Sequence, residues 1–210
     1  MPVDEVLKVP YQLPGSQAWQ WVNIYTRLSQ ERIIFLNQSL TIGVANSLIS
    51  ALLYLDSEDQ SKPIFLYINS YGDPVATGMA DETAGMMSVT AGLSIYDTMQ
   101  HISSPIVTIA MGQCIGMSAL LLSSGEKGKR ASLPHTELGL VHPYAGGQGQ
   151  ASDIEVTAAE MLRKRSLMLE ILSKNTGQTV EKIAEDMQRS FSLTPEAAKE
   201  YGLIDTVIQR

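Results

Sequence analysis

Residue types that could support nucleophilic chemistry gather in one short segment, "GQCIGMSALLLSSG", residues 112–125. The segment follows an apolar, β-branched run, "PIVTIAM" at 105–111, and continues with the composition of a buried helix. A sharp strand-to-helix turn holds its apex residue over a helix N-terminus, which is a favourable place for a nucleophile. Here the apex residue is Gly116, with Cys114 and Ser118 two residues away on either side. The segment has the form of a nucleophile turn without a nucleophile at its apex.

Cys114 and Ser118 are the neighbouring candidates for a displaced nucleophile. Because an α-helix turns by about 100° per residue, Ser118 is rotated by about 200° from Gly116 and is expected to face packing neighbours. Cys114 is more typical of a small apolar core residue than of a reactive thiol. A glycine in such a turn can also simply relieve backbone crowding, so the residues of this segment alone leave the chemistry open.

The surrounding elements alternate between strands and helices, which predicts an α/β fold with right-handed crossovers. Apolar residues recur at helical spacing after Thr41, a plausible N-cap, and the stretch 71–88 has no period and is expected to be a long loop. The further expected elements are strands at 32–36, 63–70 and 105–111 and a helix at 90–102.

The C-terminal part predicts a projecting unit, residues 145–176, made of a glycine-rich ribbon and a long helix. Ser152 and Glu155 form an expected capping box for that helix, and Gly177 ends it. Shorter helices are expected from Thr179 through Gln188 and from Pro195 to Gly202, followed by a last strand in "LIDTVI". Residues 1–21 are expected to be an irregular arm, and residues 22–210 a single domain.

Composition excludes several classes of function. The chain has 210 residues and a net charge of -7, so nucleic acid is not an expected partner. A single cysteine excludes an internal disulfide and a cysteine zinc site, and we expect no metal or other cofactor. The acidic N-terminal segment resembles neither a signal nor a transit peptide, and no apolar run is long enough to span a bilayer, so a cytoplasmic protein is expected.

Several blocks resemble the ClpP family, the proteolytic subunits of Clp proteases, and the similarity extends over residues 22–208. The resemblance implies a crotonase-like spiral of ββα units, a handle formed by 145–176, and heptameric rings stacked in pairs. It also implies a serine, histidine and aspartate triad in a closed chamber. The blocks that carry the resemblance are "IYTRLSQERIIFL", "FLYINS", "SIYDTM", "ALLLSSGEKGKR", "GGQGQASDIEV" and "EAAKEYGLID".

The family's triad positions are occupied by other residues in this chain. The serine position of the family's G-Q-x-x-S-M-G-A block is Gly116, and an ungapped register places Val141 at the histidine position and Ser190 at the aspartate position. His142 takes the histidine position only if compensating gaps are introduced. In an extended segment, a shift by one residue moves a side chain to the opposite face, so His142 is expected to point away from the cleft. Asp186, one helical turn before Ser190, is expected to be an exposed helix residue rather than a displaced orienter.

The segment that supplies an oxyanion donor in the family reads "SYGD", Ser70 to Asp73, and leads into an insertion relative to ClpP within 71–88. An acidic residue at this point disfavours a developing negative charge. These departures resemble ClpR, the catalytically silent ClpP paralogue of cyanobacteria and plastids. The sequence therefore predicts a non-catalytic subunit in the cytoplasm of a cyanobacterium, with a plastid as the less favoured location.

The resemblance further implies an active ClpP paralogue as ring partner and an AAA+ chaperone such as ClpC. The chaperone would dock in an apolar cleft whose matching positions include Phe65, Tyr67 and His101, the last replacing the usual aromatic residue. ATP would bind to the chaperone, because the chain has no G-x-x-x-x-G-K-[ST] motif. Two alternatives stay open, a weakly active serine peptidase with a displaced nucleophile and a crotonase-like protein that binds acyl thioesters.

Overall fold

The computed structural model describes residues 7–12, 15, 18–73, 84–143, 150–188 and 191–209. In these ranges the main sheet has seven strands, and its neighbours run in the order β3-β4-β5-β6-β9. All of these pairs are parallel; β7 pairs in parallel with β5 and antiparallel with β8. The expected α/β fold with a parallel sheet is confirmed. The strands are β3 (Ile33–Leu36), β4 (Ile64–Ser70), β5 (Ile106–Ile115), β6 (Arg130–Ser132), β7 (Glu137–Leu140), β8 (Phe191–Leu193) and β9 (Thr206–Val207).

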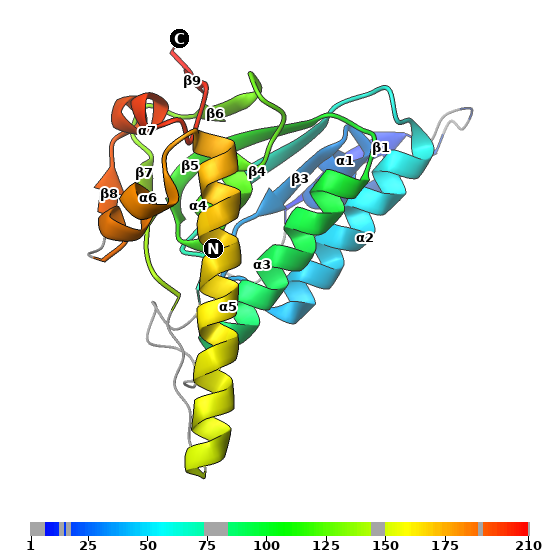
Figure 1. The fold of residues 1–210 in the computed structure, drawn as a ribbon. Helices are drawn as coiled ribbons and strands as arrows, with labels where there is room; N and C mark the ends of the chain where they lie inside the picture. The colour runs from blue at the N-terminus through cyan, green and yellow to red at the C-terminus, as the bar shows by residue number, and fades with distance from the viewer. Residues whose placement is uncertain are drawn as a thin grey trace.

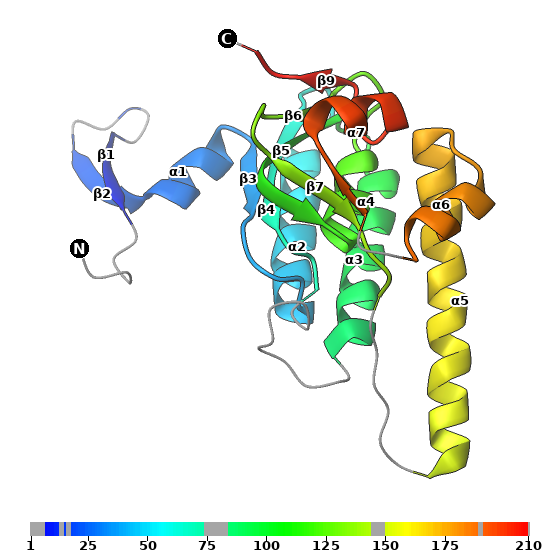
Figure 2. The ribbon, with the colours of Figure 1, turned by 90° about the vertical axis from the view of Figure 1, so that its left-hand side faces the viewer.

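Helices α2, α3 and α4 cover one face of this sheet, with α2 and α3 side by side and α5 outermost (Figures 1 and 2). The short helix α4 packs between α3 and α5, and all of its residues are buried. The core therefore lies between the sheet and α2, α3 and α4. The helices are α1 (Ile24–Gln30), α2 (Ile42–Glu58), α3 (Ala84–His101), α4 (Met117–Ser123), α5 (Ala151–Thr176), α6 (Val180–Asp186) and α7 (Pro195–Tyr201).

Local signals place most of these elements where the sequence predicts them. The Thr41 hydroxyl accepts the Val44 N–H and begins α2, and Thr179 and Thr194 begin α6 and α7 in the same way. Gly177 ends α5 in the left-handed conformation, at a φ of 80°. Along β4, Ile64, Leu66 and Ile68 are buried while the alternating residues are not, as expected for a strand with helices over one face.

The expectation of an irregular N-terminal arm is wrong. Within residues 1–21 the chain forms β1 (Lys8–Gln12), which pairs antiparallel with β2 (Trp19–Asn23), and the hairpin extends past the expected boundary at residue 21. Prolines suggested irregular structure, yet Pro10 lies in β1 opposite Trp21. A two-stranded hairpin has only edge strands, where proline is tolerated.

The expected loop over residues 71–88 is too long at its C-terminal end, because α3 already begins at Ala84. Residues 74–83 lie outside the described residues. At the start of α3 the buried residues Gly85, Ser88 and Val89 recur at helical spacing on one face. Two of the three, a glycine and a serine, are not apolar side chains, so the sequence shows no apolar period there.

The expected capping box at the start of α5 is also wrong. The helix begins at Ala151, and its N-cap is Gln150, whose side chain makes no capping hydrogen bond. Ser152 and Glu155 therefore both lie inside the helix and are exposed. Of the expected ribbon, residues 145–149 lie outside the described residues.

Helix α5 extends well beyond the sheet (Figure 1). Its C-terminal half packs on the core through Met168, Leu169 and Leu172. Its N-terminal half, in contrast, exposes Ile154, Val156 and Leu162. The projecting half has apolar side chains that no other described residue covers.

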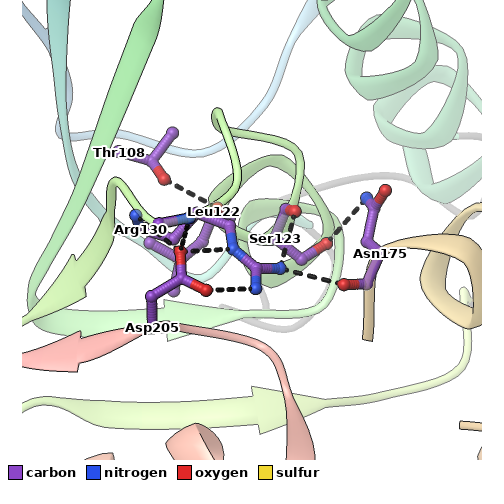
Figure 3. Close-up of polar contacts among 7 residues, drawn as sticks. Thr108, Leu122, Ser123, Arg130, Asn175 and Asp205 are labelled. Carbon is purple, nitrogen blue, oxygen red and sulfur yellow. Dashed lines mark hydrogen bonds and ion pairs between the residues drawn. The ribbon is translucent and has the colours of Figure 1, made fainter. Parts of the chain in front are cut away.

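The C-terminal end of α5 is joined to the sheet by a buried arginine (Figure 3). Arg130 on β6 is paired with Asp205 through Nε to Oδ2 at 2.9 Å and Nη2 to Oδ1 at 2.7 Å. Its Nη1 donates to the carbonyl oxygens of Ser123 in α4, at 3.2 Å, and Asn175 in α5, at 3.0 Å. Burial opposes ionisation of Asp205, but the hydrogen bonds from Arg130 and Gly128 outweigh it, and the pKa of Asp205 is lowered.

Replacing Asp205 by Asn is expected to lower the free energy of unfolding by about 3 kcal/mol, because it leaves a buried guanidinium without its counter-charge. Urea denaturation followed by circular dichroism measures the change. Glu126→Gln is the matched control: it breaks the exposed pair between Glu126 and Lys129 and is expected to cost less than about 1 kcal/mol. Equal losses in the two variants would contradict the role assigned to Arg130.

Candidate functional site

Gly116 forms the turn between β5 and α4, with φ 60° and ψ -122°. Its N–H donates to the Gly139 carbonyl on β7 at 2.9 Å, and its own carbonyl accepts the Leu120 N–H at 3.1 Å. A side chain at this backbone conformation is strained by on the order of 1–3 kcal/mol. The turn has the strained form that nucleophile turns use, and glycine adopts it without that strain.

Val141 is the side chain nearest to the open position over this turn. A Cβ atom added to Gly116 would lie 3.0 Å from Val141 Cγ2 and 3.9 Å from the Tyr71 carbonyl oxygen. The structure thus brings together Gly116 and Val141, which the sequence alignment places at the serine and histidine positions of the family's triad. Ser190, the third, lies outside the described residues.

Cys114 and Ser118, the two candidates for a displaced nucleophile, are both buried in the core next to the turn. Cys114 is fully buried in β5, opposite Ser70 and Leu138 on the adjacent strands, and burial raises the pKa of its thiol. Ser118 is also fully buried, and its Oγ has no hydrogen-bond partner. A thiol held neutral and a hydroxyl sealed in the core are poor nucleophiles.

His142 lies beside the turn but makes no hydrogen bond through Nδ1, which is buried. Burial lowers the pKa of its imidazole, and the positive charge of Arg165 on α5 lowers it further. His142 is one of the residues that line a cavity next to the turn. Because β7 ends at Leu140, strict strand alternation does not extend to 141 and 142, and the expected direction of the His142 side chain stays a prediction.

The cavity beside the turn has a volume of about 330 Å³ and mostly apolar walls. Its polar lining residues include Asp73, Glu137 and His142, and of these Asp73 is buried. Tyr71 and Ser192 add hydroxyl groups to the lining. Apolar walls are supplied by Ile115, Leu138, Val141 and Phe191, so the cavity could hold an apolar group.

The "SYGD" segment closes over the N-terminus of α4. Gly72 has a φ of 74°, and a Cβ on it would be 2.6 Å from the Ile115 carbonyl oxygen and 3.1 Å from both the Met117 and Ser118 nitrogens. The Gly72 N–H donates to Ser70 Oγ at 2.9 Å, and the Asp73 N–H donates to the Tyr71 carbonyl at 2.9 Å. Both N–H groups are therefore used inside the segment rather than directed at the cavity.

Asp73 stands out in this segment from the sequence alone, whereas the role of Gly72 does not. A glycine two residues after a buried serine is the signal that could have found it, because a left-handed residue in close contact with another backbone must lack a Cβ. Packing against α4 makes Gly72 part of the turn's structure.

Asp186 is engaged away from the turn. Its Oδ2 accepts the Tyr201 hydroxyl at 2.8 Å, which joins α6 to α7. Burial, followed by this hydrogen bond and the carboxylate charge, raises the pKa of the Tyr201 phenol. The described contacts give Asp186 a structural role between two short helices.

The three candidate docking residues are differently placed. Phe65 and Tyr67 lie on the face of β4 opposite to its buried residues Ile64, Leu66 and Ile68, and both are half-buried. Tyr67 stacks on Phe35 of β3, with ring centroids 5.5 Å apart, whereas Phe65 lines a charged cavity next to Arg32. His101 is the exposed last residue of α3.

Two absences apply to the described residues only. Among them, no group of three or more His, Cys, Asp or Glu side chains is arranged to hold a metal ion. No helix among them combines the length and apolar character needed to cross a membrane.

The sequence of the chain is similar to that of known proteins. The sequence matches the family described as Clp protease over residues 15–84 and 82–210. It is 52% identical over 202 residues to the ATP-dependent Clp protease proteolytic subunit 2 of Prochlorococcus marinus strain NATL2A, across 95% of this chain and 94% of the relative. The same identity, length and coverage are found with the ATP-dependent Clp protease proteolytic subunit 3 of Synechococcus sp. strain CC9605.

The pKa of His142 is expected to lie below the value of an exposed histidine, and Arg165→Gln is expected to raise it by removing the neighbouring charge. A folded-state pKa below the unfolded one means that stability is present above the unfolded pKa and falls as the pH drops through it. Titration by nuclear magnetic resonance of the three histidines, with His142→Gln to assign the signal, measures the shift.

Arg163→Gln is the matched control for this titration. Arg163 lies two residues away on the same helix but is exposed and paired with Glu160, so its removal should leave the His142 signal in place. An ordinary or raised pKa for His142 in the unmodified chain would contradict the burial and charge described here.

Proposed function

We propose, since the chain belongs to the Clp protease family, that it is a non-catalytic structural subunit of the Clp protease core. It co-assembles with an active ClpP paralogue into mixed heptameric rings, which stack in pairs. This chain supplies ring contacts and chamber wall, and the paralogue supplies the peptidase sites. The relatives named above are called proteolytic subunits, so this proposal separates the chain from the activity in their names.

The observation that carries the proposal is the contact between Gly116 and Val141. A serine-type site needs a nucleophilic oxygen, a base that takes its proton and an acid that orients the base. At the turn, a Cβ on residue 116 would meet the Val141 methyl group at 3.0 Å, where a base would have to stand. Residue 116 carries no hydroxyl, and the side chain nearest to it is the methyl group of Val141 rather than an imidazole.

Electrostatic stabilisation is disfavoured by the same segment that covers the turn. An oxyanion needs preorganised N–H donors aimed at the position of the developing charge. The Asp73 N–H donates to the Tyr71 carbonyl instead, and Asp73 is one of the residues that line the cavity. A donor that is already occupied gives no stabilisation to a negative transition state.

The assembly surfaces support a structural role. The projecting half of α5 exposes Ile154, Val156 and Leu162, and Val156 is 70% exposed. Exposed apolar side chains on a helix that leaves the body of the subunit are typical of a protein interface. We propose that this half of α5 packs against the facing ring.

The other functions considered are less well supported. A serine peptidase that uses Ser118 would need an accessible hydroxyl, and this one is fully buried. A crotonase-like protein would need to bind an acyl thioester, and calorimetry with acyl-CoA would detect such binding. Neither alternative accounts for the exposed apolar side chains of α5.

The proposed partners follow from the family. An AAA+ chaperone such as ClpC would deliver unfolded substrate, and it would bind the ring through clefts that include Phe65 and Tyr67. His101 lies at the third position of this cleft in the family pattern, and an exposed imidazole there weakens docking on this subunit relative to its paralogue. The proposed location of the complex is the cytoplasm of a cyanobacterium.

Gly116→Ser alone is expected to give no peptidase activity. The new side chain would adopt a strained backbone conformation and meet Val141 instead of a base. Hydrolysis of fluorogenic peptides and labelling by a fluorophosphonate probe test this, with Gly116→Ala as the control for folding. Hydrolysis by the serine variant above the level of the alanine variant would show that a base, such as His142, reaches the turn.

Mixed rings test the subunit role directly. Ser118→Ala in this chain is expected to leave the peptidase rate of purified mixed rings unchanged, because the hydroxyl is buried without a partner. Replacing the nucleophilic serine of the active paralogue should abolish the activity of the same rings. A native mass spectrum establishes that both chains are present, and loss of activity in the Ser118→Ala rings would contradict the proposal.

A further inference from the structure

The N-terminal hairpin presents two exposed tryptophans on one face. Trp19 and Trp21 are two residues apart in β2 and are 67% and 70% exposed. Their cross-strand neighbours, Gln12 and Pro10, are exposed as well. Tryptophan is a large, mostly apolar side chain, so two of them side by side in solvent indicate a surface that is covered by a partner.

The other face of the hairpin is already occupied by α1. Val9, Tyr11 and Val22 are half-buried, and the Arg27 guanidinium lies 5.2 Å from the centre of the Tyr11 ring. The Ile24 N–H donates to the Leu7 carbonyl at 2.9 Å. Figure 2 shows the hairpin extending from the end of α1, away from the other helices. In the described chain, nothing covers the tryptophan face.

A cavity of complementary character lies between α1, β3 and α2. Its volume is about 340 Å³, and none of its lining residues is a carboxylate or a cation. Apolar walls come from Phe35, Val44 and Leu48, and the rim carries the side-chain amides of Asn37 and Gln38. An indole needs such a site, because it has an apolar ring and a single N–H donor. The cavity beside Gly116, in contrast, contains Asp73 and Glu137.

The tryptophan face and the cavity cannot meet within one chain. Tyr25 and Ser29, which line the cavity, are four residues apart and share one face of α1. Arg27, which holds the hairpin, is rotated by about 200° from Tyr25 and therefore lies on the opposite face. Because the tryptophan face and the cavity lie on opposite sides of α1, they can meet only if they belong to two different molecules. Such a head-to-tail contact either closes into a ring or continues as a filament.

We propose that the Trp19–Trp21 face docks into the cavity between α1, β3 and α2 of a second copy of this chain, at a position next to it in the ring. The inference rests on the proposed ring assembly and deepens it. Each copy contributes its hairpin to one neighbour and its cavity to the other. The contact also stabilises the hairpin, because an isolated pair of strands is only marginally stable in water.

Cross-linking between two variants tests the contact in mixed rings. One variant carries Trp21→Cys and the other Ser47→Cys, at the exposed rim of the cavity; the native Cys114 is fully buried and stays unreactive. Both are assembled with an active paralogue from which cysteines have been removed, and a short bis-maleimide is added. A cross-linked dimer of this chain is expected. Replacing Ser47→Cys by Glu181→Cys, on the exposed side of α6, is the control and should give none.

Tryptophan emission gives an independent measurement, because the chain has only two tryptophans and both lie on this face. The mixed rings are assembled with a paralogue that has no tryptophan. Because the contact buries both indoles, ring formation is expected to shift their emission to shorter wavelength and to reduce acrylamide quenching several-fold. Ser47→Arg, which fills the rim of the cavity, should reverse both effects. A shift that appears only after an AAA+ chaperone with ATP, or an unfolded substrate, is added would assign the face to that partner and overturn the proposal.

A native mass spectrum distinguishes failure of this inference from failure of the proposed function. If mixed rings form but give no cross-linked dimer, and the tryptophan emission stays at the wavelength of exposed indoles, the proposed tryptophan contact is wrong and the subunit role is unaffected. If no mixed rings form, the subunit role fails, and the contact fails with it unless the chain alone gives the cross-link and the blue shift.

Discussion

The position of the turn depends on the buried pair of Arg130 and Asp205. The guanidinium binds the carbonyl oxygens at the C-terminal ends of α4 and α5, while Asp205 joins it to β9 (Figure 3). Helix α4 is thus fixed at both ends, by Gly116 to β7 at its start and by Arg130 at its finish. A cation inside the protein requires such complete pairing, because an unpaired buried charge is strongly destabilising. The same pairing holds the projecting helix α5 to the sheet.

This constraint explains how a nucleophile turn can persist without a nucleophile. The turn at Gly116 connects β5, a central strand, to a helix that is entirely buried, and both belong to the main core. Gly72 fits against the same turn and is fixed by Ser70 and Leu40. Packing therefore maintains the backbone geometry, whereas chemistry depends on a few side chains that can be replaced without disturbing it.

The unpaired surfaces of the subunit lie at opposite ends of its structure. The projecting half of α5 and the N-terminal hairpin both expose apolar side chains and both leave the body of the molecule (Figure 2). Near Gly116, burial and the charge of Arg165 lower the pKa of His142. The distribution of apolar surface thus favours assembly.

The sequence by itself determined the elements that depend on neighbouring residues. Thr41, Thr179 and Thr194 cap their helices through hydrogen bonds three residues away, and the period-two burial of β4 follows from the pleat of a strand. The motif blocks also determined the family, because many residues in fixed order are specific. Only the tertiary structure decided the outcomes that depend on distant partners. Pairing with Trp21 made Pro10 part of a strand, and β7 ended at Leu140, so that strand alternation does not set the direction of His142. Gly116 and Val141 follow the ends of two separate strands, β5 and β7, and the distance between them is set by how the sheet closes around its core, which local sequence does not encode.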